Sequence, residues 1–136
     1  MDYGLAALKL FCVHLKRARK SPSENAFSLG GILFQRIWLQ GIIVSAPSEG
    51  GENRGYLLDD GTGIIELHIY GEFRNHRWEV GMYVMVVGGY SGLDGDLPVI
   101  KVHKIIDLSE FPDRESMWYL EVIEVFELFY RPLFED

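Results

Sequence analysis

The sequence has little of what disulfide-bonded, metal-centred or membrane-embedded proteins need. Its 136 residues include one cysteine, Cys12, so no internal disulfide and no thiolate zinc site can form. The longest uninterrupted apolar run, residues 82–87, has six residues, far short of the roughly 20 that span a bilayer as a helix. No repeat, low-complexity tract or secretory signal pattern is recognisable. These absences favour a cytosolic or nuclear protein that does not contact a membrane.

Basic residues are also scarce relative to acidic ones. There are 13 Lys and Arg against 20 Asp and Glu, a net charge of −7. Residues 1–20 nevertheless carry a net +4, and residues 107–136 a net −7. Because phosphate neutralisation supplies much of the affinity for nucleic acids, we expect weak or no direct DNA binding. The basic cluster that could bind DNA weakly, or act as an import signal, comprises Lys16, Arg17, Arg19 and Lys20.

Catalytic and metal-binding patterns are missing as well. None of the four histidines lies at metal-ligand spacing from another histidine, a cysteine or a carboxylate. His68 and Glu66 share a strand face, where a solvent-facing histidine is expected, and two side chains are too few for a metal site. We interpret Asp59-Asp60 as turn chemistry and Cys12 as a buried, unreactive thiol. The sequence therefore predicts a protein that is not an enzyme and uses no metal and no cofactor.

Five β-strands are expected in the middle of the chain. The first, at residues 34–46, is apolar on both alternating faces, which is typical of a strand buried on both sides, and Gly41 predicts a bend within it. An Asp-Gly turn joins the second and third strands, and a Gly/Asp loop at residues 91–97 joins the last two. The four later strands are predicted at residues 56–58, 64–70, 82–88 and 98–108.

The order of these strands favours one architecture. A long bent first strand, a tight hairpin and a longer connection after the third strand are typical of the five-stranded OB-fold barrel; a generic five-stranded sheet is the alternative. We expect an all-β fold with a flanking C-terminal α-helix, the barrel occupying residues 32–108. Residues 1–31 form an N-terminal segment and connection, in which residues 5–20 fit a helix and a strand equally well. Residues 109–136 hold the partner-binding helix and tail.

The helix predicted at residues 115–130 has more apolar surface than one small barrel can cover. Its apolar side chains occupy an arc of about 160°, whereas a surface helix needs about 100°. They are Trp118, Tyr119, Val122, Ile123, Val125, Phe126, Phe129 and Tyr130, and Glu121, Glu124 and Glu127 form a separate acidic stripe. The excess predicts packing against a helix of another chain. The alternative is that the N-terminal segment covers it.

Four segments of the chain resemble parts of one known family. The entry to the C-terminal helix reads Asp107-Leu108-Ser109-x-x-Pro112-x-x-Glu115-Ser116-Met117-Trp118-x-Leu120-Glu121-Val122. The fourth and first strands read Tyr83-Val84-Met85-Val86-x-Gly88 and Trp38-x-Gln40-Gly41-x-x-Val44, and the N-terminal segment contains Leu8-Lys9 and His14-Leu15-Lys16-Arg17. Together these segments resemble the RecQ-mediated genome instability protein 2 family over most of residues 8–125. Residues 47–58 and 126–134 depart from the family pattern.

That resemblance implies a nuclear, non-enzymatic OB-fold subunit. It implies a heterodimer with the C-terminal OB domain of RecQ-mediated genome instability protein 1 and, through it, association with topoisomerase III alpha and a RecQ or Bloom-type helicase. The family's complex dissolves double Holliday junctions and suppresses crossovers, and its partner contact uses the C-terminal helix in the manner of the replication protein A subunits. The alternative is a single-strand DNA-binding OB subunit of a replication protein A-like or telomere-capping complex. Its stacking platforms would be Tyr56, Tyr70, Phe73 and Trp78.

The candidate partner-binding residues lie mainly on the helix. Trp118 corresponds to the family's helix tryptophan and is expected to anchor the partner, the alternative being that it packs on its own barrel. Lys9 and Trp38 correspond to a family lysine and tryptophan, and Trp38 is taken as core. Lys104 is expected on one strand face with three apolar side chains, where it pairs with a partner or lies along the barrel rim; these are Ile100, Val102 and Ile106. The full partner-binding set is Lys9, Lys104, Met117, Trp118, Val122, Val125, Phe126 and Phe129.

Overall fold

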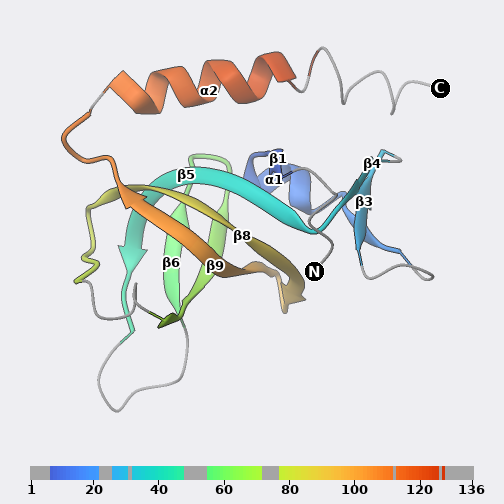
Figure 1. Ribbon diagram of the computed structural model, residues 1–136, viewed down its shortest axis with the longest axis horizontal. Coiled ribbons are helices and arrows are strands. Elements are labelled where there is room, and N and C mark those ends of the chain that lie inside the picture. The colour runs from blue at the N-terminus through green and yellow to red at the C-terminus, as the bar shows by residue number, and fades with distance from the viewer. Residues whose placement is uncertain are drawn as a thin grey trace.

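Nine strands and two helices make up the part of the chain that the structure describes, a computed structural model covering residues 7–21, 26–30, 32–47, 55–71, 77–111, 113–125 and 127. In chain order they are β1 (Leu8–Lys9), α1 (Cys12–Leu15), β2 (Arg19–Lys20), β3 (Phe27–Leu29), β4 (Ile32–Phe34), β5 (Arg36–Ser45), β6 (Tyr56–Asp59), β7 (Ile64–Ile69), β8 (Tyr83–Asp94), β9 (Leu97–Asp107) and α2 (Asp113–Val125). Figure 1 shows these elements in space, with α2 lying across the outside of β5.

Strands β5 to β9 close into a barrel. β5 pairs antiparallel with β6 along one edge and with β8 along the other. β6 pairs antiparallel with β7, β7 parallel with β9, and β9 antiparallel with β8, so the ring of strands returns to β5. The five strands and the C-terminal helix are those of the OB-fold, which confirms the predicted fold class.

The first barrel strand is buried on one face along its whole length and on the other face only in part. Ile37, Leu39 and Ile43 point into the core and are fully buried. On the outward face Trp38 packs on Trp118 of α2 and Gln40 is 7% exposed, whereas Ile42 and Val44 remain 39% and 43% exposed. The expectation of burial on both faces was therefore wrong for the second half of the strand.

Gly41 lies where β5 passes from its pairing with β8 to its pairing with β6. A Cβ atom at this position would lie 2.5 Å from the backbone carbonyl oxygen of Asp59. Glycine is therefore required for the two strands to approach this closely. β5 is drawn as one long curved strand in Figure 1, which agrees with the predicted bend.

The N-terminal segment contains both of the structures that its pattern allowed. β1 adds to β5 as a short parallel strand, and α1 follows as one helical turn whose Cys12 and Leu15 are buried in the core. The next residues differ from the expected loose connection, because β2, β3 and β4 form a small antiparallel sheet of their own. Aromatic packing holds this sheet on the barrel. The ring centroids of Phe27 and Phe34 lie 4.6 Å and 6.1 Å from that of Tyr90.

The Gly/Asp loop expected at residues 91–97 is mostly strand. β8 continues to Asp94, β9 begins at Leu97, and only residues 95 and 96 form the turn. Gly92 and Gly95 have φ values of 90° and 62°. Both glycines had predicted a loop. Gly92 instead lies at an irregularity within β8, and Gly95 lies in the two-residue turn.

A β-bulge changes which residues of β9 face outward. Val87 pairs with Lys104 but the next residue of β8 pairs with Val102, so His103 is an extra residue in β9. Ile105 is 3% exposed, as Val102 is 5% exposed, and Lys104 points to solvent. The prediction that Lys104 shares a face with Ile100 and Val102 was wrong, because one inserted residue reverses the alternation. The part of the prediction that places Lys104 on one face with Ile106 is confirmed, since both side chains are exposed.

Candidate partner-binding surface of the C-terminal helix

One face of α2 is buried against the barrel of its own chain. Trp118 is 1% exposed and Val122 fully buried, in a cluster with Phe11 and Trp38. The rings of Trp118 and Trp38 lie 6.0 Å apart between centroids. Trp118 thus packs on its own barrel, the alternative that the sequence left open, and neither it nor Val122 presents its side chain to solvent.

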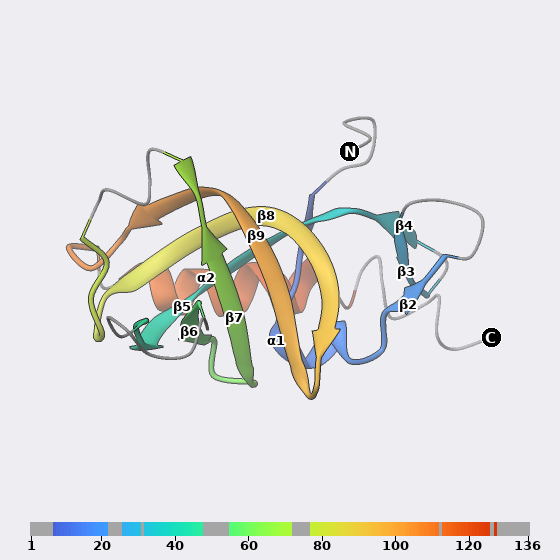
Figure 2. The ribbon, with the colours of Figure 1, turned by 90° about the horizontal axis from the view of Figure 1, so that it is seen from below.

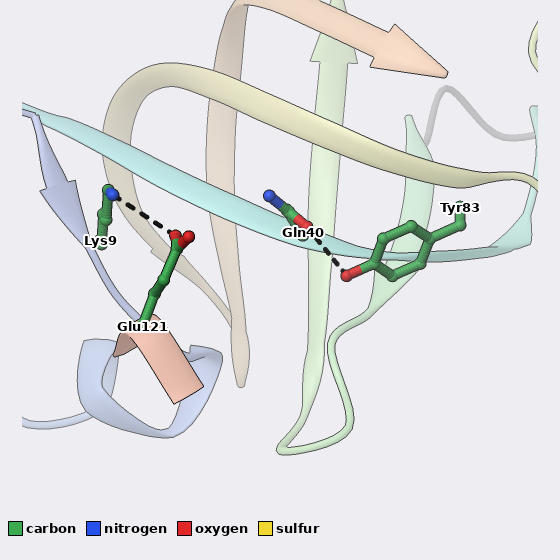
Figure 3. Close-up of polar contacts among 4 residues, drawn as sticks. All are labelled: Lys9, Gln40, Tyr83 and Glu121. Atoms are coloured by element: carbon green, nitrogen blue, oxygen red, sulfur yellow. Dashed lines mark hydrogen bonds and ion pairs between the residues drawn. The ribbon is translucent and has the colours of Figure 1, made fainter. Parts of the chain in front are cut away.

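Polar contacts hold the same helix on two sides. The Tyr119 hydroxyl donates a hydrogen bond of 2.8 Å to the backbone carbonyl of Asp60. The Lys9 ammonium lies 3.5 Å from the Glu121 carboxylate (Figure 3). It also lies 4.7 Å from the centre of the Trp38 ring. Both charged side chains are more than a third exposed or close to it, at 33% for Lys9 and 42% for Glu121, so the pair adds about 0–1 kcal/mol. Lys9, assigned to the partner by resemblance, here joins β1 to α2.

Near the start of α2, the buried side-chain amide of Gln40 forms a hydrogen bond with the phenol of Tyr83. The Tyr83 hydroxyl donates a hydrogen bond of 3.0 Å to the side-chain oxygen of Gln40, as Figure 3 shows. Gln40 is 7% exposed. Burial, and next the Glu115 carboxylate, raise the pKa of Tyr83, so the phenol stays protonated and remains a donor. The hydrogen bond from Tyr83 gives the buried side-chain oxygen of Gln40 a donor.

The carboxylate of Asp60 joins the β6–β7 turn to α1. Its Oδ2 accepts a hydrogen bond of 2.6 Å from the backbone N–H of Cys12. Its Oδ1 accepts hydrogen bonds from the backbone N–H and hydroxyl of Thr62, at 2.8 and 2.7 Å, and from the N–H of Gly63 at 3.2 Å. The turn-chemistry interpretation is confirmed, and since Tyr119 bonds to the same residue, the turn also positions α2.

Two further chemistry-bearing side chains, Cys12 and Glu66, are buried. Cys12 is buried as predicted, and burial, then the Asp60 charge, raise the pKa of its thiol to about 12, which favours the less reactive protonated form. Glu66 is 4% exposed rather than solvent-facing, and its carboxylate lies 2.7 Å from the Nε2 atom of His68. Among the described residues, no three histidine, cysteine or acidic side chains gather as a metal site. No described helix is long and apolar enough to cross a membrane.

The opposite face of α2 keeps apolar side chains in solvent. Met117, Leu120 and Ile123 are 48%, 68% and 51% exposed. Their spacing of three places them along one side of the helix, and we call these three residues the exposed stripe. Sequence reasoning included Met117 but neither Leu120 nor Ile123 among the partner-binding residues. The signal was present, because a leucine lies among the glutamates of the polar side of the helix.

The other predicted residues lie outside the described part of the chain or on other surfaces of it. Phe126 and Phe129 lie outside the described residues, as does the side chain of Val125. The basic cluster of Lys16, Arg17, Arg19 and Lys20 lies at the surface, its first two residues following α1 and its last two forming β2. Among the four expected stacking platforms, Tyr70 is 53% exposed, Trp78 is buried at 6%, and Phe73 lies outside the described residues.

Comparisons with solved structures reproduce the architecture. The Stn1–Ten1 complex of S. pombe contains a chain that superposes with a TM-score of 0.77 at 12% identity, covering 94% of this chain and 96% of that one. A replication protein A heterotrimer bound to single-stranded DNA contains one with a TM-score of 0.67 at 17% identity, covering 88% and 94%. At these identities the likeness shows the OB-fold alone.

Comparisons of sequence show the family. The family model of RecQ-mediated genome instability protein 2 matches residues 6–126. The RecQ-mediated genome instability protein 2 of Gallus gallus is 32% identical over 126 residues, which cover 87% of this chain and 90% of the relative. That of Mus musculus is 35% identical over 126 residues, covering 87% and 80%. The chain therefore belongs to the RecQ-mediated genome instability protein 2 family and is an OB-fold protein of genome stability.

Proposed function

We propose that this chain is a non-catalytic nuclear subunit that pairs through α2 with the C-terminal OB domain of RecQ-mediated genome instability protein 1. In this function it stabilises the complex of a RecQ helicase with topoisomerase III alpha, which dissolves double Holliday junctions and suppresses crossovers. The family membership supports the assignment to genome stability. The pairing itself is supported by the surface of the helix.

The observation that carries the proposal is the exposed stripe. Three large apolar side chains in solvent on one helix face are costly for a monomer and are the type of surface that a partner covers. Trp118 and Val122 have another function in this proposal, because they fix α2 to the barrel and so present the stripe rigidly. Pre-ordering the helix lowers the entropy that binding would otherwise cost.

The electrostatics of α2 restrict its partner. Glu124 is exposed on α2 and Glu127 is exposed two residues beyond its end, so a partner helix with an apolar seam and basic flanking residues fits best. Lys104 lies exposed on the outward face of β9 and is proposed to contact a carboxylate of the partner. Val125, Phe126 and Phe129 are proposed to extend the apolar contact beyond Ile123.

Co-expression of the chain with the C-terminal OB domain of RecQ-mediated genome instability protein 1, followed by size exclusion in high salt, tests the pairing. We expect a heterodimer that survives, because apolar contacts are not weakened by salt as charge contacts are. The double variant Leu120→Glu/Ile123→Glu should lose at least about 2 kcal/mol of pairing, or about 30-fold in affinity.

A matched control separates this effect from a general loss of solubility. Val80 and Leu93 are 60% and 56% exposed and lie outside α2. The double variant Val80→Glu/Leu93→Glu therefore makes the same chemical change elsewhere and should keep the heterodimer. Equal pairing by both double variants would exclude α2 as the interface.

A further inference from the structure

A pocket of about 390 Å³ lies away from α2, between the small N-terminal sheet and the β8–β9 hairpin. Figure 2 shows these two parts of the chain next to each other. The side chains that matter for its chemistry are Lys20, Phe27, Tyr90, Ser91, Lys101 and His103. None of the lining residues comes from α2, β6 or β7. The pocket exists because β2 and β3 fold into strands, which the sequence did not predict.

Its polar lining is basic in a chain that is acidic overall. Lys20 comes from β2 and Lys101 from β9, and both side chains are exposed. No carboxylate is found among the described residues that line the pocket. Partial burial and the nearby Arg36 guanidinium lower the pKa of His103, so its imidazole is neutral near pH 7 and available for hydrogen bonding. The pocket therefore favours an anion.

The strand register places Gly89 between two cationic residues. Gly89 of β8 pairs with Arg36 on one side and Lys101 on the other. Residues paired across antiparallel strands lie on the same face. Gly89 is itself buried and has no side chain, so it lines the pocket without filling the space beside Lys101.

One wall of the pocket is aromatic. The rings of Phe27 and Tyr90 lie 4.6 Å apart between centroids at an angle of 51°, and Phe34 stacks behind Tyr90 at 6.1 Å. Tyr90 is 8% exposed and Phe27 is half-buried, so Phe27 has the more accessible ring. Burial raises the pKa of Tyr90 to about 12, which keeps its hydroxyl a neutral donor.

We propose that this pocket binds a nucleotide unit of single-stranded DNA, with Lys20 and Lys101 contacting phosphates and the base lying against Phe27. Two lysines on separate strands suit successive phosphates of a strand, whereas a single phosphoryl group on a peptide is typically held by converging arginines. A nucleotide has a flat base that can lie against an aromatic ring and an anionic phosphate that can contact a lysine. The inference goes beyond the proposed pairing and does not depend on it.

Fluorescence anisotropy of a labelled oligothymidylate of about 12 nucleotides, titrated with the full chain at low salt, tests the site. The double variant Lys20→Ala/Lys101→Ala should bind about tenfold more weakly. Its salt dependence should flatten by about 0.7 in log–log slope for each phosphate that the protein no longer neutralises. Both lysines are exposed, so folding should be unchanged, which circular dichroism will verify.

The control is Arg77→Ala/Arg114→Ala, which removes the same charge from two exposed arginines outside the pocket. We expect it to keep the affinity within about twofold. An equal loss in both double variants would show non-specific attraction and overturn the site. So would an absence of DNA binding by the unsubstituted chain, or binding of a phosphoserine peptide in preference to the oligonucleotide. Because no tested lysine lies on α2, failure here leaves the pairing proposal unaffected.

Discussion

The indole rings of Trp38 and Trp118 lie 6.0 Å apart between centroids, at an interplanar angle of 30°. This contact joins the first strand of the barrel to the C-terminal helix. Lys9 lies over the same Trp38 ring and reaches Glu121, so β1 takes part in the joint as well. The joint determines which face of α2 is buried and leaves the exposed stripe for a partner.

Replacing Trp118 with alanine should therefore destabilise the chain itself. A buried tryptophan truncated to alanine costs about 3–5 kcal/mol of unfolding free energy, measurable by urea denaturation. Trp118→Phe is the matched control, because the indole N–H has no acceptor among the described residues, and it should cost less than about 1.5 kcal/mol. A Trp118→Ala chain of unchanged stability that fails to bind its partner would instead identify Trp118 as an interface anchor.

The two aspartates of the β6–β7 turn should differ in their effects on stability. Asp60→Ala leaves the donors of Cys12, Thr62 and Gly63 without their acceptor and should cost about 3 kcal/mol or more. The Asp59 side chain accepts one exposed hydrogen bond, from the N–H of Gly61, so Asp59→Ala should cost about 1 kcal/mol. Chemical denaturation of both variants measures the difference. Equal losses would contradict the assignment of Asp60 as the residue that joins the turn to α1.

The barrel could be predicted from the sequence because its strands alternate or are continuously apolar and are separated by polar or glycine-rich segments. The N-terminal sheet could not, because β3 and β4 have three residues each and too short a pattern to read. Their order comes from Phe27 and Phe34 packing on Tyr90, which is far away in the chain. The basic pocket was missed for the same reason.

The sequence predicted that the candidate site lies on the C-terminal helix, but it did not predict which face of that helix is exposed. Helical periodicity shows which side chains of α2 lie on the same face, but it does not show which face packs against the barrel. Trp118 was chosen because it corresponds to the family's helix tryptophan and is a large aromatic, but its size and apolarity also place it, with Val122, against the chain's own core. Lys104 was misplaced because periodicity cannot reveal the extra residue at His103.

Neutralising the ion pair of Lys9 and Glu121 should have little effect on the free chain. Both side chains are partly exposed, so Glu121→Gln should change the unfolding free energy by less than about 1 kcal/mol. Lys9→Ala should cost somewhat more, because it also removes the cation from the Trp38 ring. Thermal melts at low and high salt measure both. A loss in Glu121→Gln as large as that expected for Trp118→Ala would show that the pair, rather than the tryptophan joint, fixes the helix.

Stability should fall at alkaline pH, with Cys12 contributing a defined part. Its thiol pKa is raised from 9.0 to about 12 in the folded chain, so folding favours the protonated form. The contribution is fully present below pH 9.0 and is lost as pH rises towards the folded value, since only the unfolded thiol releases its proton in between. For one proton the slope is about 1.4 kcal/mol per pH unit.

Urea denaturation of the unsubstituted chain and of Cys12→Ser across this range isolates that contribution. The serine variant is less stable at neutral pH but should lose stability less steeply above pH 9.0, because its hydroxyl does not ionise there. Tyr83 and Tyr90 begin to contribute only above their ordinary pKa of 10.0, so the slope between pH 9.0 and 10.0 reports on the thiol. Parallel pH profiles for the two proteins would mean that the Cys12 thiol is accessible to solvent, contrary to its full burial beside Asp60.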